Sequence, residues 1–188
     1  MPEMKKIILG LVGHPSCGKD TVAAYLASQF NFKHISTGDT VRQYITSNNL
    51  GGLDRPNMQV VANQLRAEYG AGTLAEMALQ DPAESLAISG LRTIAEAETL
   101  KQAGGQIICI TAPIELRYER AKARGRVGED IDLEKFAEIE SREAYSRDPN
   151  GQNTEGVIAL ADHTINNVGT LAELHSQIDK LVLQLEHE

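Results

Sequence analysis

The chain has 188 residues, of which 41% are hydrophobic and 23% charged, a composition typical of one soluble globular domain with a substantial core. Its formal net charge of −8 argues against the broad basic surface that nucleic acid polymers need, although a nucleotide can still bind to local arginines. The apolar run at residues 7–12 is too short for a signal peptide core or a spanning helix. We therefore expect a cytoplasmic protein without a membrane partner, and its cysteines, Cys17 and Cys109, fit a reducing compartment without a disulfide.

Buried strands and amphipathic helices alternate along the sequence. Residues 5–13, KKIILGLVG, form a continuous apolar run that ends in glycine, as in a strand buried on both faces of a parallel sheet. Further strands are expected over residues 32–35, 85–89, 106–110 and 161–165. Helices are expected over residues 20–30, 36–45, 57–70, 93–103, 114–126, 132–147 and 171–185. This alternation predicts an α/β fold with a doubly wound, five-stranded parallel sheet, whose ligand lies beyond the carboxyl ends of the strands.

The segment after the first strand, GHPSCGKDT, has the spacing of a phosphate-binding loop (P-loop, or Walker A motif), Gly13-x4-Gly18-Lys19. The glycines allow backbone N–H groups to surround an anion at a helix N-terminus, and the lysine reaches the β- and γ-phosphates. A glycine-containing turn with a surface lysine is the alternative, but the strand–loop–helix context favours ATP binding. The residues expected to bind ATP are Gly13, His14, Pro15, Ser16, Cys17, Gly18, Lys19, Asp20 and Thr21, with Lys19 also catalytic.

Asp20 stands where this motif normally has serine or threonine. An unpaired carboxylate ~4 Å from a phosphate charge would cost roughly 4 kcal/mol at an effective dielectric constant near 20. A magnesium ion resolves the conflict, because Mg²⁺ accepts carboxylate, hydroxyl and phosphate oxygens together. We therefore predict Mg²⁺ as a cofactor and Asp20 as its ligand, with Thr21 either assisting or packing in the helix.

Three segments resemble small P-loop kinases. HISTGDTVR, at residues 34–42, resembles the acceptor-side segment of adenylate kinases, and ISGLRTIAEAETLK, at residues 88–101, resembles their "DGFPRT…QAE" segment. ADHTINNVGTLAELHSQIDKL, at residues 161–181, resembles the end of dephospho-CoA kinases. The resemblance spans residues 7–185 and fits the nucleoside monophosphate kinase superfamily as a group; together with GKD, the segment at 90–98 is similar to archaeal adenylate-kinase-related proteins and phage-type deoxynucleotide kinases.

The resemblance implies one P-loop kinase domain over residues 1–188, with a three-layer P-loop NTPase fold. It implies an acceptor-binding insertion at about 37–80 and a short helical lid at about 125–149. The implied activity is transfer of the γ-phosphoryl group of ATP, with Mg²⁺, to a nucleoside monophosphate or a similar small phosphorylated acceptor. The oligomeric state implied is a monomer or a homodimer.

Residue roles follow from the same resemblance. The residues implied to bind the acceptor are Thr37, Gly38, Arg42 and Arg92. The arginines implied to act in catalysis are Arg92, Arg120 and Arg124, and further lid candidates are Arg117, Arg126, Arg142 and Arg147. Asn166, in the loop at 166–169, is implied to border the donor adenine. Guanidinium groups suit these roles because they bind phosphate oxygens bidentately.

Two positions depart from the adenylate kinase pattern. Ser89 replaces an aspartate that orients the magnesium shell, and we hypothesise that the metal-side carboxylate has moved to Asp20. Glu96 replaces a glutamine that reads adenine, so the acceptor base is not predicted.

Simpler explanations compete for several of these residues. The arginine-rich helix at 114–126 could be a solvated face with i,i+4 pairs to nearby glutamates. STGD residues make ordinary helix caps, so Asp39 is either an N-cap or an acceptor contact. The side chains of His14 and Cys17 are expected to point away from the phosphates and not to bind metal.

Two other functions compete with the predicted kinase. A dephospho-CoA kinase is favoured by the C-terminal segment but disfavoured by STGD with Arg42. A nucleotide-binding regulatory protein or slow ATPase is favoured by the missing acid at Ser89 and the missing loop hydroxyl.

Overall fold

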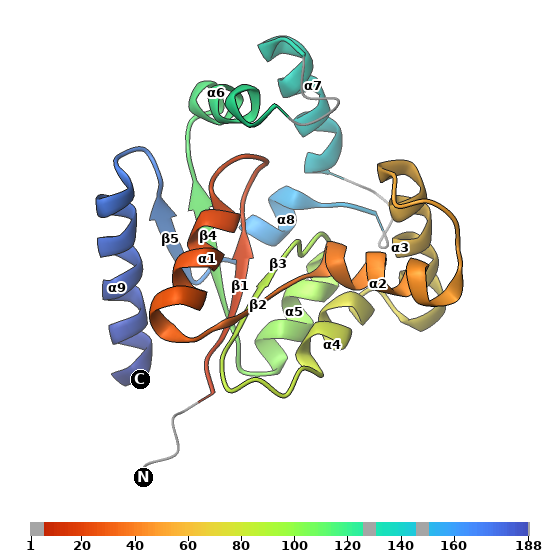
Figure 1. Ribbon diagram of the computed structural model, residues 1–188, viewed down its shortest axis with the longest axis horizontal. Coiled ribbons are helices and arrows are strands. Elements are labelled where there is room, and N and C mark those ends of the chain that lie inside the picture. Colours follow the sequence, from red (N-terminus) through yellow and green to blue (C-terminus); the bar gives the residue numbers. More distant parts are fainter. Residues whose placement is uncertain (1–5, 126–130, 146–150, 188) are drawn as a thin grey trace.

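The protein, in a computed structural model that describes residues 6–125, 131–145 and 151–187, is built on one five-stranded sheet (Figure 1). The strands are β1 (Ile8–Val12), β2 (Lys33–Ser36), β3 (Leu86–Ser89), β4 (Gln106–Thr111) and β5 (His163–Asn166). Their order is β2-β3-β1-β4-β5, and every pairing is parallel. The predicted five-stranded parallel sheet of a P-loop NTPase fold is confirmed.

Helices cover both faces of this sheet because successive strand residues point to opposite sides. Leu9 and Leu11 of β1 pack with α1 (Lys19–Phe30) and α9 (Leu171–His187). Ile8 and Val12 face α4, α5 and α8. These three helices are α4 (Thr73–Leu79), α5 (Ile94–Gln102) and α8 (Thr154–Ile158). The β1 strand is therefore buried on both faces, as its continuous apolar run predicts.

A helical body, made of α2 (Thr37–Asn48), α3 (Arg55–Tyr69) and α4, has a core of its own. That core consists of Val41, Ile45, Val61, Ala62, Leu65 and Leu74. Ser36, and not Asp39, caps α2, since its hydroxyl accepts from the Gly38 N–H. A buried ion pair, Arg66 Nε to Glu96 Oε1 at 2.9 Å, joins the helical body to α5.

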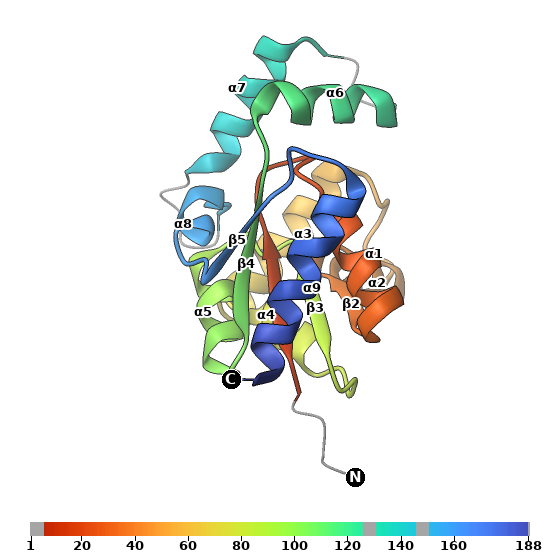
Figure 2. The same cartoon turned by 90° about the vertical axis from the view of Figure 1, so that its left-hand side faces the viewer.

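The remaining helices, α6 (Ile114–Arg124) and α7 (Leu133–Ala144), lie beyond the carboxyl ends of the strands in both Figure 1 and Figure 2. Asp132 caps the N-terminus of α7, because its carboxylate accepts from the Lys135 N–H. It falls within the lid predicted at 125–149, of which residues 126–130 and 146–149 lie outside the described ranges. Within the described ranges, none of the helices is long and apolar enough to cross a membrane.

Candidate active site

The loop between β1 and α1 has a backbone that only glycine allows at two points. Gly13 has φ 136° and Gly18 has φ 110°. A Cβ added at Gly13 would lie 2.2 Å from the Ile110 carbonyl oxygen, and one at Gly18 would lie 2.3 Å from Asn167 Nδ2. The loop is therefore enclosed between the end of β4 and the segment after β5, and its shape depends on both glycines.

The side chain of Lys19 lies along this loop. Its ammonium donates to the carbonyl oxygens of Gly13 at 2.7 Å and His14 at 2.9 Å. Asn167, which is buried, donates from Nδ2 to the Cys17 carbonyl at 2.8 Å. The N-cap of α1 is Gly18, which has no side chain to cap the helix, so the backbone N–H groups of the first turn can bind an anion. The loop thus combines a fixed backbone, a helix N-terminus and a cation.

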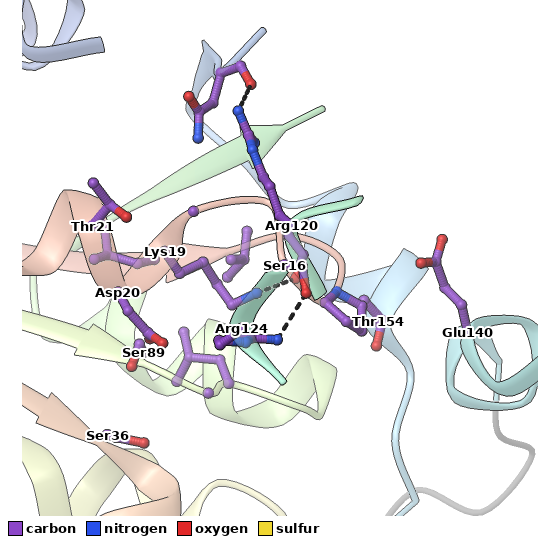
Figure 3. Close-up of a pocket in the computed structure, with 18 of the residues that line it drawn as sticks. Ser16, Lys19, Asp20, Thr21, Ser36, Ser89, Arg120, Arg124, Glu140 and Thr154 are labelled. Carbon is purple, nitrogen blue, oxygen red and sulfur yellow. Dashed lines mark hydrogen bonds between the residues drawn. The ribbon is translucent and has the colours of Figure 1, made fainter. Parts of the chain in front are cut away.

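Two arginines of α6 reach this loop and its surroundings (Figure 3). Arg124 Nη2 donates to Ser16 Oγ at 2.9 Å, and Arg120 Nη2 donates to the Asn167 carbonyl at 2.9 Å. The other terminal nitrogen of Arg120 is buried without a hydrogen-bond partner among the described residues. An unsatisfied buried N–H group costs about 1–3 kcal/mol, more when it is charged, so this atom marks a place where an anion would be stabilised.

One cavity of about 1120 Å³ joins these groups to the helical body. Its lining includes most of the expected site residues, namely Gly13, Pro15, Ser16, Gly18, Lys19, Asp20, Thr21, Arg42, Arg92, Arg120 and Arg124. The structure thus brings residues of the phosphate loop, α2, the segment between β3 and α5, and α6 to one cavity. His14, Cys17, Thr37, Gly38 and Asn166 do not line it.

Asp20 and Ser89 line the same part of this cavity. Asp20 is exposed in the first turn of α1, and Figure 3 shows its carboxylate directed toward Ser89. Ser89 ends β3 beside Leu11 of β1, and its hydroxyl is 2.8 Å from His34 Nε2. The described residues contain no cluster of three or more His, Cys, Asp or Glu side chains that could hold a metal. A single carboxylate with a hydroxyl nearby fits Mg²⁺, which commonly takes one or two carboxylates and completes its shell with phosphate oxygens and water.

Two more of the predicted arginines line the cavity, Arg42 from α2 of the helical body and Arg92 from the segment between β3 and α5. Arg92 Nη1 donates to Gln152 Oε1 at 3.0 Å, and Arg42 Nη1 lies 2.5 Å from Asp39 Oδ1. Thr37 is buried and does not line the cavity. Its hydroxyl donates at 2.7 Å to the carbonyl of Gly90, which does line the cavity. Thr37 therefore holds the Gly90 backbone in position without lining the cavity itself.

Other candidates lie away from the cavity. Glu96, at the position of an adenine-reading residue in the resemblance, is fully buried and completes a capping box with Thr93. Arg142 pairs with Glu138 on the outer face of α7. Arg117 is buried beneath α7. Arg126 and Arg147 lie outside the described residues.

The structure adds lining residues that sequence reasoning missed. These are Arg55 at the start of α3 and Phe136, Ile139 and Glu140 on α7. The helical spacing of 136, 139 and 140 was a readable sign that one face of α7 turns inward. Asn167 falls in the loop at 166–169 that the resemblance implied for the donor side, but its contact with the phosphate loop, 150 residues away in sequence, has no local pattern.

The two cysteines are free thiols on buried positions beside the loop. Burial raises the pKa of the Cys109 thiol, and the nearby Cys17 acts in the same direction. A raised pKa keeps the Cys109 thiol protonated and weakly nucleophilic at neutral pH.

Comparisons with known proteins agree with this geometry. The profile of a family described as an AAA domain matches residues 9–146. A UPF0200 protein of Aeropyrum pernix is 31% identical over 93% of this chain and 91% of its own length. A UPF0200/UPF0201 protein of Archaeoglobus fulgidus is 30% identical over 97% of this chain, which spans only 56% of that relative. The structure of shikimate kinase from Acinetobacter baumannii in complex with shikimate superposes with a TM-score of 0.63, at 17% identity, covering 98% of this chain and 97% of the kinase, a likeness that shows the fold alone.

Proposed function

The chain belongs to the family described as an AAA domain and to the UPF0200 proteins, within the kinase-like P-loop superfamily, and on that premise we propose that it is a small-molecule kinase. The proposed reaction transfers the γ-phosphoryl group of ATP to a nucleoside monophosphate or a similar small phosphorylated acceptor. The expected location is the cytoplasm, and no nucleic acid polymer or membrane takes part.

The proposed roles follow from where the side chains lie. Lys19 and the loop N–H groups bind the donor phosphates, and Arg120 and Arg124 stabilise the charge that spreads over the transferred group. Asp20 would hold Mg²⁺, which when bound neutralises charge on the donor phosphates. No general base is required, because phosphoryl transfer depends mainly on positioning and electrostatic stabilisation.

The observation that carries the proposal is a cavity lined by more cationic groups than a nucleotide site alone requires. The phosphate loop and α6 supply Lys19, Arg120 and Arg124, while Arg42 comes from α2 of the helical body and Arg92 from the segment between β3 and α5. An ATPase needs the first set only. A second set of arginines in the same cavity fits an anionic acceptor bound near the donor.

The test is ADP release from Mg·ATP with a panel of acceptors: AMP, dAMP, CMP, UMP, GMP, dTMP, dephospho-CoA and shikimate, plus a reaction without acceptor. One acceptor should raise turnover at least about a hundredfold, in line with two oriented reactants. Arg92→Ala should lose that stimulation. Arg142→Ala is the matched control, because Arg142 is an exposed arginine on α7 that pairs with Glu138.

Slow ADP release whose rate is the same with and without acceptor, and the same in wild type and Arg92→Ala, would contradict the proposed kinase activity. It would support the second candidate, a nucleotide-binding regulator or slow ATPase, which is favoured by the serine at position 89, where adenylate kinases have an acid. Stimulation by dephospho-CoA alone would instead place the acceptor oxygen on a ribose.

A further inference from the structure

Three helices, α6, α7 and α8, meet the phosphate loop in a set of ionisable side chains, the Glu140 cluster, which consists of His14, Arg117, Glu140 and Glu155. Arg117 Nη2 donates to Glu140 Oε1 at 2.8 Å, and its Nη1 donates to the other carboxylate oxygen. The side chains of Arg117 and Glu140 are only 5% and 14% exposed. This is a bidentate pair largely removed from water, the arrangement in which such pairs bind most strongly.

The same guanidinium also contacts the main chain of the phosphate loop. Arg117 Nη1 donates to the Pro15 carbonyl at 3.4 Å, while Nε donates to the Ala112 carbonyl at 2.9 Å. One side chain of α6 thus connects the end of β4, the phosphate loop and α7.

A second link between the loop and its neighbours runs through His14. Its Nδ1 lies 3.3 Å from Glu140 Oε1, without the alignment of a hydrogen bond, and its Nε2 lies 3.2 Å from Glu155 Oε1 on α8. The His14 side chain is therefore turned out of the loop toward two carboxylates.

Helix α7 forms a wall of the cavity on the turn next to Glu140. Phe136, four residues before Glu140, is buried, lines the cavity and packs edge-on against Tyr118 at 5.8 Å between ring centres. Ile139 lines the same wall. A contact that fixes the position of Glu140 therefore also fixes the face of α7 that lines the cavity.

We propose that Arg117 and Glu140 are positioning residues that hold the wall helix α7 and the phosphate loop in one relative arrangement through the Pro15 carbonyl. The inference deepens the proposed function, because it says how the nucleotide end of the cavity is held in shape. An apolar pair of similar volume would fill the same space with equal or better stability. Of these two alternatives, only the Arg117–Glu140 pair supplies a donor to the Pro15 carbonyl of the loop. Stability alone therefore does not account for the geometry.

The proposal separates stability from positioning in a defined set of variants. Glu140→Ala leaves Arg117 buried without its carboxylate and should lower both thermal stability and nucleotide affinity. The double variant R117M/E140M should regain thermal stability while the loop still lacks the Arg117 contact to the Pro15 carbonyl. Glu138→Gln is the matched control, since Glu138 is an exposed glutamate on the outer face of the same helix.

Two readouts need no acceptor. Hydrogen exchange of the backbone amides at residues 13–19, without nucleotide, should be at least about fivefold faster in R117M/E140M than in wild type, the lower limit for a typical coupling between sites. Calorimetry with a non-hydrolysable ATP analogue and Mg²⁺ should show at least the same loss of affinity. Glu138→Gln should match wild type in both.

Wild-type loop exchange and wild-type analogue affinity in a thermally recovered R117M/E140M would overturn the inference, because the pair would then serve stability alone. Failure of the proposed function is recognised separately. If the wild-type protein binds the analogue but phosphorylates none of the acceptors, the proposed kinase activity is rejected. The inference about Arg117 and Glu140 is then unaffected. If the wild type binds no analogue, unchanged loop exchange in the double variant still overturns the inference and faster exchange still supports it.

Discussion

The two ends of the cavity are built differently. At the loop end, formed by residues 13–21 and α6, most polar groups are bonded to the protein itself, as Lys19 is to two loop carbonyls and Asn167 is to a third. At the helical end, formed by α2–α4, Arg42 and Asp39 are 48% and 69% exposed and bonded mainly to one another. The first end is a fixed frame, whereas the second presents side chains that can move.

This difference suggests how the two ends recognise their ligands. A preorganised set of donors binds a constant group, such as a triphosphate, without reorganisation at the moment of reaction. Exposed side chains on a separate helical core would instead adjust to the proposed acceptor when it binds. Predictions that affect one end and leave the other unchanged therefore test the comparison directly.

The largest effect is expected from the ion pair that joins the helical body to α5. Arg66→Met should lower the free energy of unfolding by about 3–5 kcal/mol, because Glu96 then keeps a buried charge without its partner. Lys101→Met, which removes a more exposed pair with Asp162, should cost within about 1 kcal/mol. Chemical denaturation measures both.

The Arg66 variant also tests whether the ends are separable. If they are, folded Arg66→Met protein binds a non-hydrolysable ATP analogue as wild type does, while amides of α2–α4 exchange faster. Equal losses at both ends would contradict the comparison.

At the loop end, Lys19→Met should reduce phosphoryl transfer by roughly 10²–10³, as expected when one preorganised cationic donor to the transition state is removed. The free energy of unfolding should fall by about 1–3 kcal/mol, because the Gly13 and His14 carbonyls lose their charged donor. Steady-state kinetics measure the loss, and Lys135→Met, on an exposed ion pair of α7, serves as the control. Normal turnover in Lys19→Met would mean that the loop does not bind the reacting phosphates.

The loop end was also the end that the sequence predicted best. The Gly13-x4-Gly18-Lys19 spacing is contiguous, and its conformation follows from glycine geometry and from the helix that begins there. The parallel sheet was equally readable, because each strand is a short apolar run between helical periods.

The parts that escaped prediction depend on contacts between distant segments. Glu140 reaches Arg117 across 23 residues, and Arg66 reaches Glu96 across 30, and neither pair has a local pattern. Glu96 is an instructive exception. Its Thr93-x-x-Glu96 spacing is a capping box that could have been read from the sequence, although the resemblance directed attention to a base-reading role.

The next prediction concerns Asp20, the proposed Mg²⁺ ligand at the loop end. Asp20→Ser should raise the Mg²⁺ concentration for half-maximal turnover by about 10- to 100-fold, a loss typical of ligand-shell changes. D20S/S89D should recover part of it, since both positions line the same region of the cavity. Turnover as a function of Mg²⁺ measures this, and an unchanged requirement in Asp20→Ser would show that the carboxylate does not serve the metal.

The smallest effects are expected at the helical end. Arg42→Ala should raise the acceptor KM about tenfold and leave the ATP KM unchanged, because one charge-assisted hydrogen bond contributes about 1.5–3 kcal/mol and solvent weakens it here. Asp39→Asn should alter the acceptor KM by less than about fivefold, since an exposed pair contributes at most about 1 kcal/mol. Acceptor saturation curves at fixed ATP measure both. Equal changes in the KM of ATP and the KM of the acceptor would mean that Arg42 affects the whole cavity. The helical end would then be as fixed as the loop end, and the two ends would not be separable.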